Sequence, residues 1–365
     1  MQDSLGATAA RAFVLDVGPG VNVPVVATPG ASCAVTLSVE GSWSSYQWLP
    51  NGETTPSITV APLETTTYAV LLSDGSGCIL RGVIEIRGTA LANPACLAPG
   101  IASITPASGT ASGGTPVVVT GTKFQPGAAL TMGGVAAGSV TVGSASSITA
   151  TAPALAPGTV NDVVVSNPDS GQAVLAAAWT TDFLDVPPSD PFHAYILSVL
   201  RNGVSAGCGN GNYCPQAAVT RAQMAVFLVR AKFGGTYEPP PASGTVFGDV
   251  PADGFAAAFI EQLAALGVTS GCGGGNYCPD AIVTRAQMAV FLLKTSLGEG
   301  YVPPPPTGTI FADVHVGDFA AAFIEDLYGR GITGGCGGVP PLYCPGASST
   351  RGQMAVFLVK TFDLP

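Results

Sequence analysis

Hydrophobic residues follow different patterns in the two halves of the chain. Up to about residue 182, short Val- and Thr-rich stretches alternate with Gly and Pro turns, as in IASITPASGTASGGTPVVVTGTKF from Ile101. This pattern is typical of the short strands of β-sandwiches. From Phe183 onwards, apolar residues recur at helical spacing. The clearest set follows Asp253 as an N-cap and stops at Gly267: Phe255, Phe259, Ile260, Leu263 and Leu266.

The second half of the chain repeats itself three times. FLDV, FGDV and FADV begin at Phe183, Phe247 and Phe311, at intervals of 64 residues. A TRAQMAVFL or TRGQMAVFL segment begins at Thr220, Thr284 and Thr350. Each repeat is predicted to form a helix, a loop and a second helix, and one unit alone cannot bury both helices. We therefore expect a compact all-α bundle of three repeats with pseudo-threefold symmetry.

These patterns predict a multidomain protein in five parts. All-β sandwiches are expected at 1–96 and 97–182, and the repeats at 183–246, 247–310 and 311–365. In the first sandwich, Trp48 is expected in the core. The Val-rich stretch of residues 12–28 would form an edge strand, or would pair with a neighbouring subunit by strand addition.

The cysteines indicate disulfides and an exported protein. Six of the nine form close pairs with five or seven residues between the partners: Cys208–Cys214, Cys272–Cys278 and Cys336–Cys344. This spacing differs from that of zinc sites, and neither histidine lies beside a pair, so no metal is expected. Each bond would staple its loop by about 2–3 kcal/mol. Cys33 and Cys78 could also bond, which would leave Cys96 unpaired, bonded to another chain, or the partner of one of those two.

The TRAQ segments combine a helix cap with an arginine. Three capping boxes are predicted, Thr220 with Gln223, Thr284 with Gln287 and Thr350 with Gln353. A cation in the first helical turn opposes the helix dipole, so Arg221, Arg285 and Arg351 need another role. They would pair with the aspartates of the FxDV motifs (Asp185, Asp249 and Asp313) or hold an external anion at the helix N-terminus.

Charge and motifs exclude several classes of function. The net charge of −10 argues against nucleic acid as a partner. Apolar runs are too short to span a bilayer, and no signal peptide is visible, which is expected of a mature or trimmed form. HExxH and phosphate-loop motifs are absent from the sequence, and two histidines 122 residues apart make a catalytic triad unexpected. We therefore expect no enzyme and no cofactor.

The repeat motifs resemble the S-layer homology domain. The shared features are Phe-x-Asp-Val, a helix that ends near Gly-Ile/Val-Thr, Cys-Pro and Thr-Arg-Ala-Gln, over Phe183 to about Phe362. The resemblance implies a three-repeat prism whose grooves bind anionic cell-wall polysaccharide. It assigns ligand contact to the arginine of each repeat, with the threonine beside it: Arg221, Arg285, Arg351, Thr220, Thr284 and Thr350. The family's Glu is Gln here in all copies, its Ala is Gly352 in the third, and the Trp usual in the first helix is missing.

The first half resembles two immunoglobulin-like modules. Residues 99–181 resemble the TIG (IPT) domain through the glycines at 109, 113 and 114, the GTKF segment and the SNPDSG turn. Residues 1–96 are similar to PKD-like modules of bacterial surface proteins.

Two roles follow for a secreted, non-enzymatic cell-surface protein. In the first, the repeats anchor it to the envelope through an anionic glycan. In the second, it assembles with copies of itself into an S-layer or filament, because a weakly charged surface packs with little repulsion, and a homo-oligomer is then expected. A weaker alternative is the non-catalytic part of a larger surface enzyme.

Overall fold

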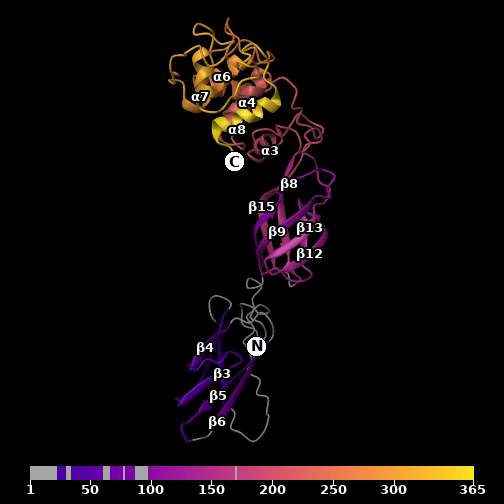
Figure 1. The fold of residues 1–365 in the computed structure, drawn as a ribbon, viewed down its shortest axis with the longest axis vertical. Helices are drawn as coiled ribbons and strands as arrows, with labels where there is room; N and C mark the ends of the chain where they lie inside the picture. The colour runs from indigo at the N-terminus through magenta and orange to yellow at the C-terminus, as the bar shows by residue number, and fades with distance from the viewer. Residues whose placement is uncertain (1–22, 30–33, 61–65, 77–78, 87–97, 169–170) are drawn as a thin grey trace.

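A computed structural model describes residues 23–29, 34–60, 66–76, 79–86, 98–168 and 171–365 (Figure 1). The predictions for Cys33, Cys78, Cys96 and the residues before 23 lie outside these ranges.

Two three-stranded antiparallel sheets form the N-terminal module. One has the order β1 (Val25–Pro29), β2 (Val35–Val39) and β4 (Ser57–Val60); the other has β3 (Ser45–Leu49), β5 (Thr66–Ser73) and β6 (Ile79–Ile86). Trp48 is fully buried between them, among Leu37, Val70 and Ile84. Its indole N–H donates to the carbonyl of Thr55 at 2.9 Å, which satisfies the one polar group that the ring brings inside.

The second module is a sandwich of a five-stranded and a four-stranded sheet. The larger sheet runs β11 (Val135–Ala136), β10 (Ala129–Met132), β14 (Thr159–Ser166), β15 (Gln172–Thr181) and β8 (Ser108–Gly109). The smaller runs β12 (Gly138–Ser144), β13 (Ser147–Thr151), β9 (Pro116–Thr122) and β7 (Gly100–Thr105). Alternate residues of both sheets fill the core, with Trp179, Val119 and Met132 fully buried.

The repeats follow β15 without a spacer and pack against the second module. Arg201 donates from Nε to the hydroxyl of Thr180 at 2.6 Å, and His193 lies 3.0 Å from the carboxylate of the buried Asp182. Phe183 packs on Gly158, where an added Cβ would lie 2.3 Å from the ring. The first repeat therefore packs directly on the sandwich.

Six helices form the core of the repeat region. They are α3 (His193–Arg201), α4 (Arg221–Phe233), α5 (Ala257–Ala265), α6 (Arg285–Leu297), α7 (Ala321–Gly329) and α8 (Arg351–Phe362). The second helices of the repeats, α4, α6 and α8, contact one another at the centre (Figure 1). Each also packs on the first helix of the next repeat: α4 on α5, α6 on α7, and α8 on α3. The pairing closes the three repeats into a ring.

The predicted fold class is wrong for this region, which is not an all-α bundle. Its helices have only 9–13 residues, and the described part of the chain has more strand than helix. Gly- and Pro-rich stretches between the helices cannot continue them. Isolated β-bridges join the repeats instead, at Ala218–Thr350, Thr220–Ile282 and Thr284–Ser348.

The start of the first helix also differs from the prediction. Helix α5 begins at Ala257, after Ala256 in a left-handed conformation with φ of 61°. Asp253 therefore lies too early in the chain to be its N-cap. Phe255 precedes the helix and is 72% exposed instead of buried. Leu266 is the C-cap residue, and the positive φ of Gly267 ends the helix as expected.

The aspartate of each FxDV motif fixes a disulfide loop. Asp249 accepts the backbone N–H of Tyr277 on one carboxylate oxygen and that of Cys278 on the other, both at 2.7 Å. Asp185 and Asp313 make the same pair of bonds in the other repeats. The disulfides Cys208–Cys214, Cys272–Cys278 and Cys336–Cys344 close these loops. The carboxylate and the covalent bond thus order Gly-rich segments that have no regular secondary structure.

At one interface of the ring, a phenylalanine packs against a glycine. Phe192, which precedes α3, packs on Gly352 at the start of α8, where an added Cβ would lie 2.5 Å from the ring. At the other two interfaces, alanine stands at both positions: Ala256 with Ala222, and Ala320 with Ala286. The glycine that departs from the repeat pattern therefore makes room for Phe192.

We expect Asp249→Asn to destabilise the protein by about 1–3 kcal/mol at pH 7, because an amide NH2 cannot accept a backbone N–H. Burial raises the pKa of Asp249, but hydrogen bonds from Tyr277 and Cys278 outweigh it and hold the pKa below its usual value. The wild-type advantage is therefore complete above the unfolded pKa of about 3.9, and is lost as the pH falls through the folded pKa.

Urea unfolding of both proteins between about pH 7 and pH 2 measures this difference, with the exposed Asp280→Asn as the matched control. A difference between wild type and Asp249→Asn that stays constant over the whole range would contradict the role of the carboxylate.

We expect Gly352→Ala to lower the free energy of unfolding by about 1–2 kcal/mol, because the new Cβ overlaps Phe192. Adding Phe192→Ala should recover part of that loss, since the interface then resembles the other two. Thermal and denaturant unfolding measure both effects. Gly346→Ala is the control, because nothing lies within 4 Å of its Cβ position. Additive effects of the two substitutions would show that the residues are not coupled.

Candidate functional site

All three TRAQ helices begin with a capping box. The threonine hydroxyl accepts the backbone N–H of the glutamine at 3.2–3.3 Å, and the glutamine side chain accepts the backbone N–H of the threonine at 3.2–3.3 Å. The residues are Thr220 and Gln223, Thr284 and Gln287, and Thr350 and Gln353. These side chains stabilise the helix ends at which the arginines lie.

The three arginines join neighbouring repeats. The guanidinium Nε of Arg221 donates to the carbonyl of Tyr277 in the next repeat at 2.7 Å, and the hydroxyl of Tyr277 donates back to the carbonyl of Arg221 at 2.9 Å. Arg285 and Tyr343 make the same reciprocal pair. Arg351 bonds to Tyr213 of the first repeat, which closes the ring.

Aromatic rings enclose each guanidinium group. The central carbon of Arg221 lies 4.5 Å from the centre of the Tyr277 ring and 5.3 Å from that of Phe291. Arg285 and Arg351 have equivalent neighbours in Tyr343 and Phe357, and in Tyr213 and Phe227. All three arginines are only 3–5% exposed. Cation–π contacts therefore supply part of the attraction that water would otherwise give the charge.

The predicted arginine–aspartate ion pairs do not form. None of the ion pairs within the described ranges joins these groups. Asp249 holds the N–H of Tyr277, and Arg221 holds the carbonyl of the same residue. The two charges thus act on one tyrosine without touching each other. The Tyr-Cys pair in all three loops (NYC, NYC and LYC) was the signal in the sequence for this tyrosine.

Burial shifts the pKa values of the three arginines and of the tyrosines that they contact. It lowers the pKa of Arg221, Arg285 and Arg351, although the adjacent tyrosine and aspartate raise it. It raises the pKa of Tyr213 to about 12 and shifts those of Tyr277 and Tyr343 upward too, against the opposing effect of the arginines. The tyrosines are therefore neutral donors at ordinary pH, and the arginines are cations.

A groove of about 470 Å³ runs along the interface of α4 and α5. Its wall includes the first disulfide loop, Gln223 and Phe227 of α4, and Phe255 before α5, while Arg351 reaches it from the third repeat. None of the described residues that line it is acidic. Two guanidinium groups, those of Arg351 and Arg230, border this groove.

Arg230 is the functional candidate that sequence reasoning missed. It lies over the ring of Phe259 at 5.4 Å and meets the exposed Glu238 at 3.3 Å, while its buried Nε has no partner in the structure. Arg351 donates from Nη2 to the hydroxyl of Ser205 at 3.2 Å in the same groove. Lys294 and Lys360 stand at the position of Arg230 in the later repeats, and this recurring cation was the available signal. The groove can accommodate an anion chemically.

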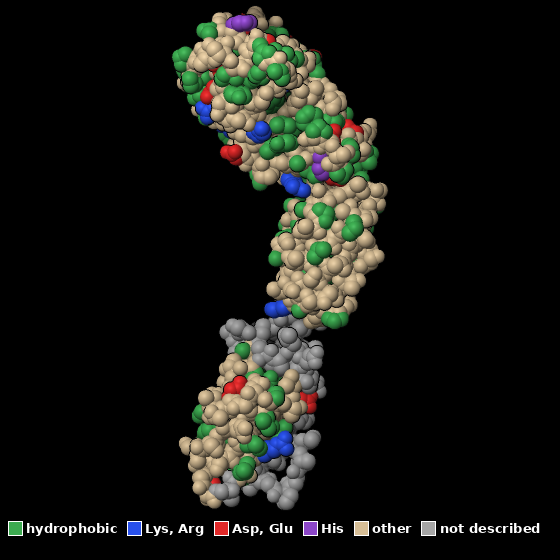
Figure 2. Space-filling model, viewed as in Figure 1, with side chains coloured by type: hydrophobic (Ala, Val, Ile, Leu, Met, Phe, Trp, Pro, Cys, Tyr) green, Lys and Arg blue, Asp and Glu red, His purple; other side chains and the backbone are tan. Residues whose placement is uncertain are grey.

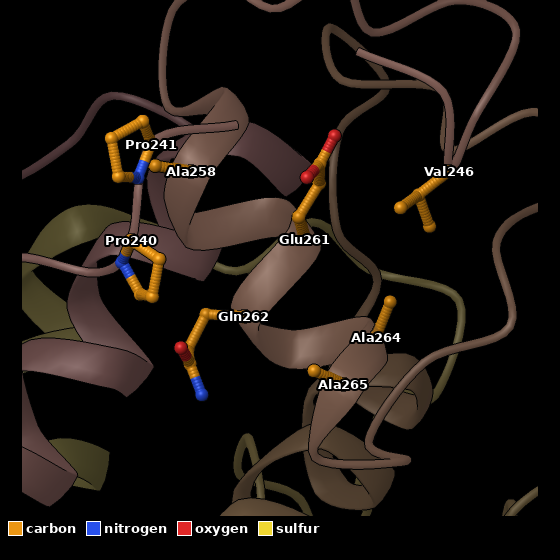
Figure 3. A pocket seen from close by; sticks show the side chains of 8 residues that line it. All are labelled: Pro240, Pro241, Val246, Ala258, Glu261, Gln262, Ala264 and Ala265. Atoms are coloured by element: carbon orange, nitrogen blue, oxygen red, sulfur yellow. The ribbon is translucent and has the colours of Figure 1, made fainter. Parts of the chain in front are cut away.

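Another hollow, of about 420 Å³, lies between α5 and the proline-rich linker (Figure 3). Glu261 borders it and accepts the backbone N–H groups of Ser243 and Gly244 at 2.8 Å each. Glu325 holds Thr307 and Gly308 in the same way. These carboxylates are occupied in fixing the linkers, so this hollow is a feature of the fold.

The described ranges contain no group of three or more His, Cys, Asp or Glu side chains placed to hold a metal ion. No helix in those ranges has the length and apolarity needed to cross a bilayer.

Family models match most of the chain from residue 99 to residue 289. The IPT/TIG domain model matches residues 99–177, and the S-layer homology domain model matches residues 182–225 and 246–289. The second of these models therefore covers parts of the first two repeats, including Arg221 and Arg285.

Two curated relatives share part of the sequence. A cell surface protein of Thermoanaerobacter kivui is 30% identical over 34% of this chain and 16% of its own length. An uncharacterized cell wall amidase of Bacillus anthracis is 34% identical over 28% of this chain and 19% of its own. The matched region thus spans less than a fifth of each relative.

A solved structure of an auxiliary nutrient binding protein from Bacteroides ovatus is 25% identical over 25% of this chain and 22% of its own, with a TM-score of 0.21. That score is too low to support an argument.

The motifs, the family models and the cell-surface relative agree with one another. The chain is an extracellular cell-surface protein that carries a TIG/IPT domain followed by S-layer homology repeats.

Proposed function

We propose that the ring of repeats anchors the chain to the cell envelope by holding an acidic polysaccharide in the groove between α4 and α5. The observation that carries this proposal is the pairing of Arg351 and Arg230 on one groove whose described lining has no carboxylate. Such a concentration of positive charge is unusual in a chain with a net charge of −10. An anionic polymer would supply the acceptor that the Nε of Arg230 lacks, since the exposed Glu238 meets only the Nη2 of that arginine.

The buried arginines have a shared role in this proposal. Arg221, Arg285 and Arg351 hold the ring together, and their charge raises the potential at the grooves between repeats. Thr220, Thr284 and Thr350 each accept a capping bond, and each hydroxyl keeps a hydrogen that it can donate to a ligand. Ligand contact by these six residues is thus compatible with their structural bonds.

Self-assembly is the second candidate function. Charged side chains are sparse on the visible face of the molecule, where green and tan surface separates isolated blue and red groups (Figure 2). Only 10% of all residues are charged, so copies of the chain would repel each other weakly. A homo-oligomeric S-layer or filament would use this surface, and anchoring and assembly can coexist in one protein.

A non-catalytic role is proposed for these modules themselves. The TIG/IPT and S-layer homology domains carry no catalytic machinery, and the sequence contains no HExxH or phosphate-loop motif. The relative named as a cell wall amidase extends well beyond the matched region, so the same modules could also serve a larger surface enzyme.

We expect Arg230→Gln to weaken binding to purified cell envelopes about tenfold, because one charge-assisted contact worth about 1.5 kcal/mol is lost. Cosedimentation at several protein concentrations measures the affinity, and wild-type binding should fall as salt is added. Arg81→Gln, an exposed arginine on β6, is the matched control.

Circular dichroism and thermal unfolding establish that the variants are folded. We avoid alanine at Arg351, because removing the ring closure would unfold the site together with any ligand contact. Equal envelope affinity of Arg230→Gln and Arg81→Gln would overturn the assignment of the groove.

A further inference from the structure

The three interfaces of the ring differ at the residue before the first helix of each pair. At α4–α5 this residue is Ala256 and at α6–α7 it is Ala320, both left-handed with φ of 61° and 63°. At α8–α3 it is Phe192, in a right-handed conformation with φ of −93°. One interface therefore contains a phenyl ring where the others have a methyl group.

Phe192 occupies its interface instead of projecting from it. Its ring packs against the hydrophobic core of the repeats and against Gly352, which has no side chain to compete for the space. The equivalent space at α4–α5 contributes to the groove, since Ala256 is one of its lining residues. Phe192 thus fills at α8–α3 a volume that is open to solvent at α4–α5.

The preceding position shows the opposite distribution of aromatic residues. Phe255 and Phe319 stand directly before the two left-handed alanines and are 72% and 68% exposed. Pro191 stands at this position in the first repeat. Exposing a phenyl ring forgoes the free energy that its burial would provide. Two rings exposed at the same place, one of them bordering the cationic groove, therefore point to a ligand that covers them.

Unpartnered guanidinium nitrogens occur at the same two interfaces. Arg230 leaves a buried Nε without a partner in the α4–α5 groove. Arg221, whose Nε enters the loop of the second repeat beside α6, leaves a buried Nη2 without a partner. The Nη2 of Arg351 in the α4–α5 groove donates to Ser205, so Arg230 supplies the unpartnered nitrogen there. At the interface that Phe192 fills, the Nη2 of Arg285 donates to the carbonyl of Gly335 at 3.3 Å, and Lys360, at the position of Arg230, donates to that of Gly331 at 3.1 Å.

We propose that the ring has two working ligand sites, at α4–α5 and α6–α7, and that Phe192 closes the third. Each working site takes an acidic sugar unit: its carboxylate faces the arginine side, and the apolar face of its pyranose ring stacks on Phe255 or Phe319. This inference rests on the proposed anchoring function and adds the number of sites and the groups that recognise the sugar. A chain of such units can engage both sites at once, which raises the avidity.

Envelope cosedimentation of paired variants tests the proposal. Phe255→Ala and Phe319→Ala should each weaken binding about tenfold, and the double variant about a hundredfold, since aromatic contacts of this kind contribute about 1–1.5 kcal/mol each. Tyrosine at both positions should retain binding, whereas leucine at both should lose it, because only tyrosine keeps a flat ring. Val302→Ala, 82% exposed on a linker, is the control for loss of exposed apolar surface.

The filled interface provides the second half of the test. Phe192→Ala combined with Gly352→Ala gives this interface the residues of the other two, so envelope affinity should be unchanged or increased. A loss comparable to that of the Phe255→Ala and Phe319→Ala double variant would show that Phe192 belongs to a working site.

The outcomes separate this inference from the proposed function. If wild type binds envelopes and Arg230→Gln weakens that binding, but the double alanine or double leucine variant binds like Val302→Ala, the stacking sites are refuted and the anchor stands. If folded wild-type protein does not sediment with envelopes, both fail. Because Phe255 and Phe319 are exposed, their variants should unfold at the wild-type temperature, which excludes misfolding as the cause of any loss.

Discussion

Closing the ring depends on burying three guanidinium groups. Removing a charge from water is costly unless hydrogen bonds and nearby electron density replace the lost hydration. Here each arginine donates to a tyrosine carbonyl in the next repeat and lies between two aromatic rings. The aspartate that holds the N–H of the same tyrosine supplies a second fixed point. The disulfide loop, the helix start and the junction between repeats therefore meet at one tyrosine.

This arrangement ties the grooves to the stability of the ring. A residue that closes the ring can contact a ligand only from a fixed position, so adaptable recognition falls to the groups around it. Arg230 and the exposed rings of Phe255 and Phe319 are free of such structural duty, which lets them contact a polymer without loosening the fold. The departures from threefold repetition, Phe192 and Gly352, are a matched pair at one interface. Repeats with the same fold therefore present different side chains at their interfaces.

Local signals made part of this structure predictable. Capping boxes and short cysteine loops involve residues close in sequence, and their repetition made the three units visible. The all-α bundle was wrong because helical spacing identified the helices but gave no measure of how much Gly- and Pro-rich chain lay between them. Phe255 fits the apolar pattern of α5, yet the left-handed Ala256 turns it outward. No periodicity encodes that turn.

Long-range contacts account for the other differences. The expected pairing of Arg221 with Asp249 matched charges correctly, but both groups bind Tyr277, some 28 residues from the aspartate and 56 from the arginine. Such a three-way contact follows from the closed ring and not from spacing along the chain.

The most direct measurement is cosedimentation of wild-type protein with intact envelopes and with envelopes from which the acidic polysaccharide has been extracted. Anchoring through the grooves predicts strong, salt-sensitive binding to the first and none to the second; equal binding to both would contradict it.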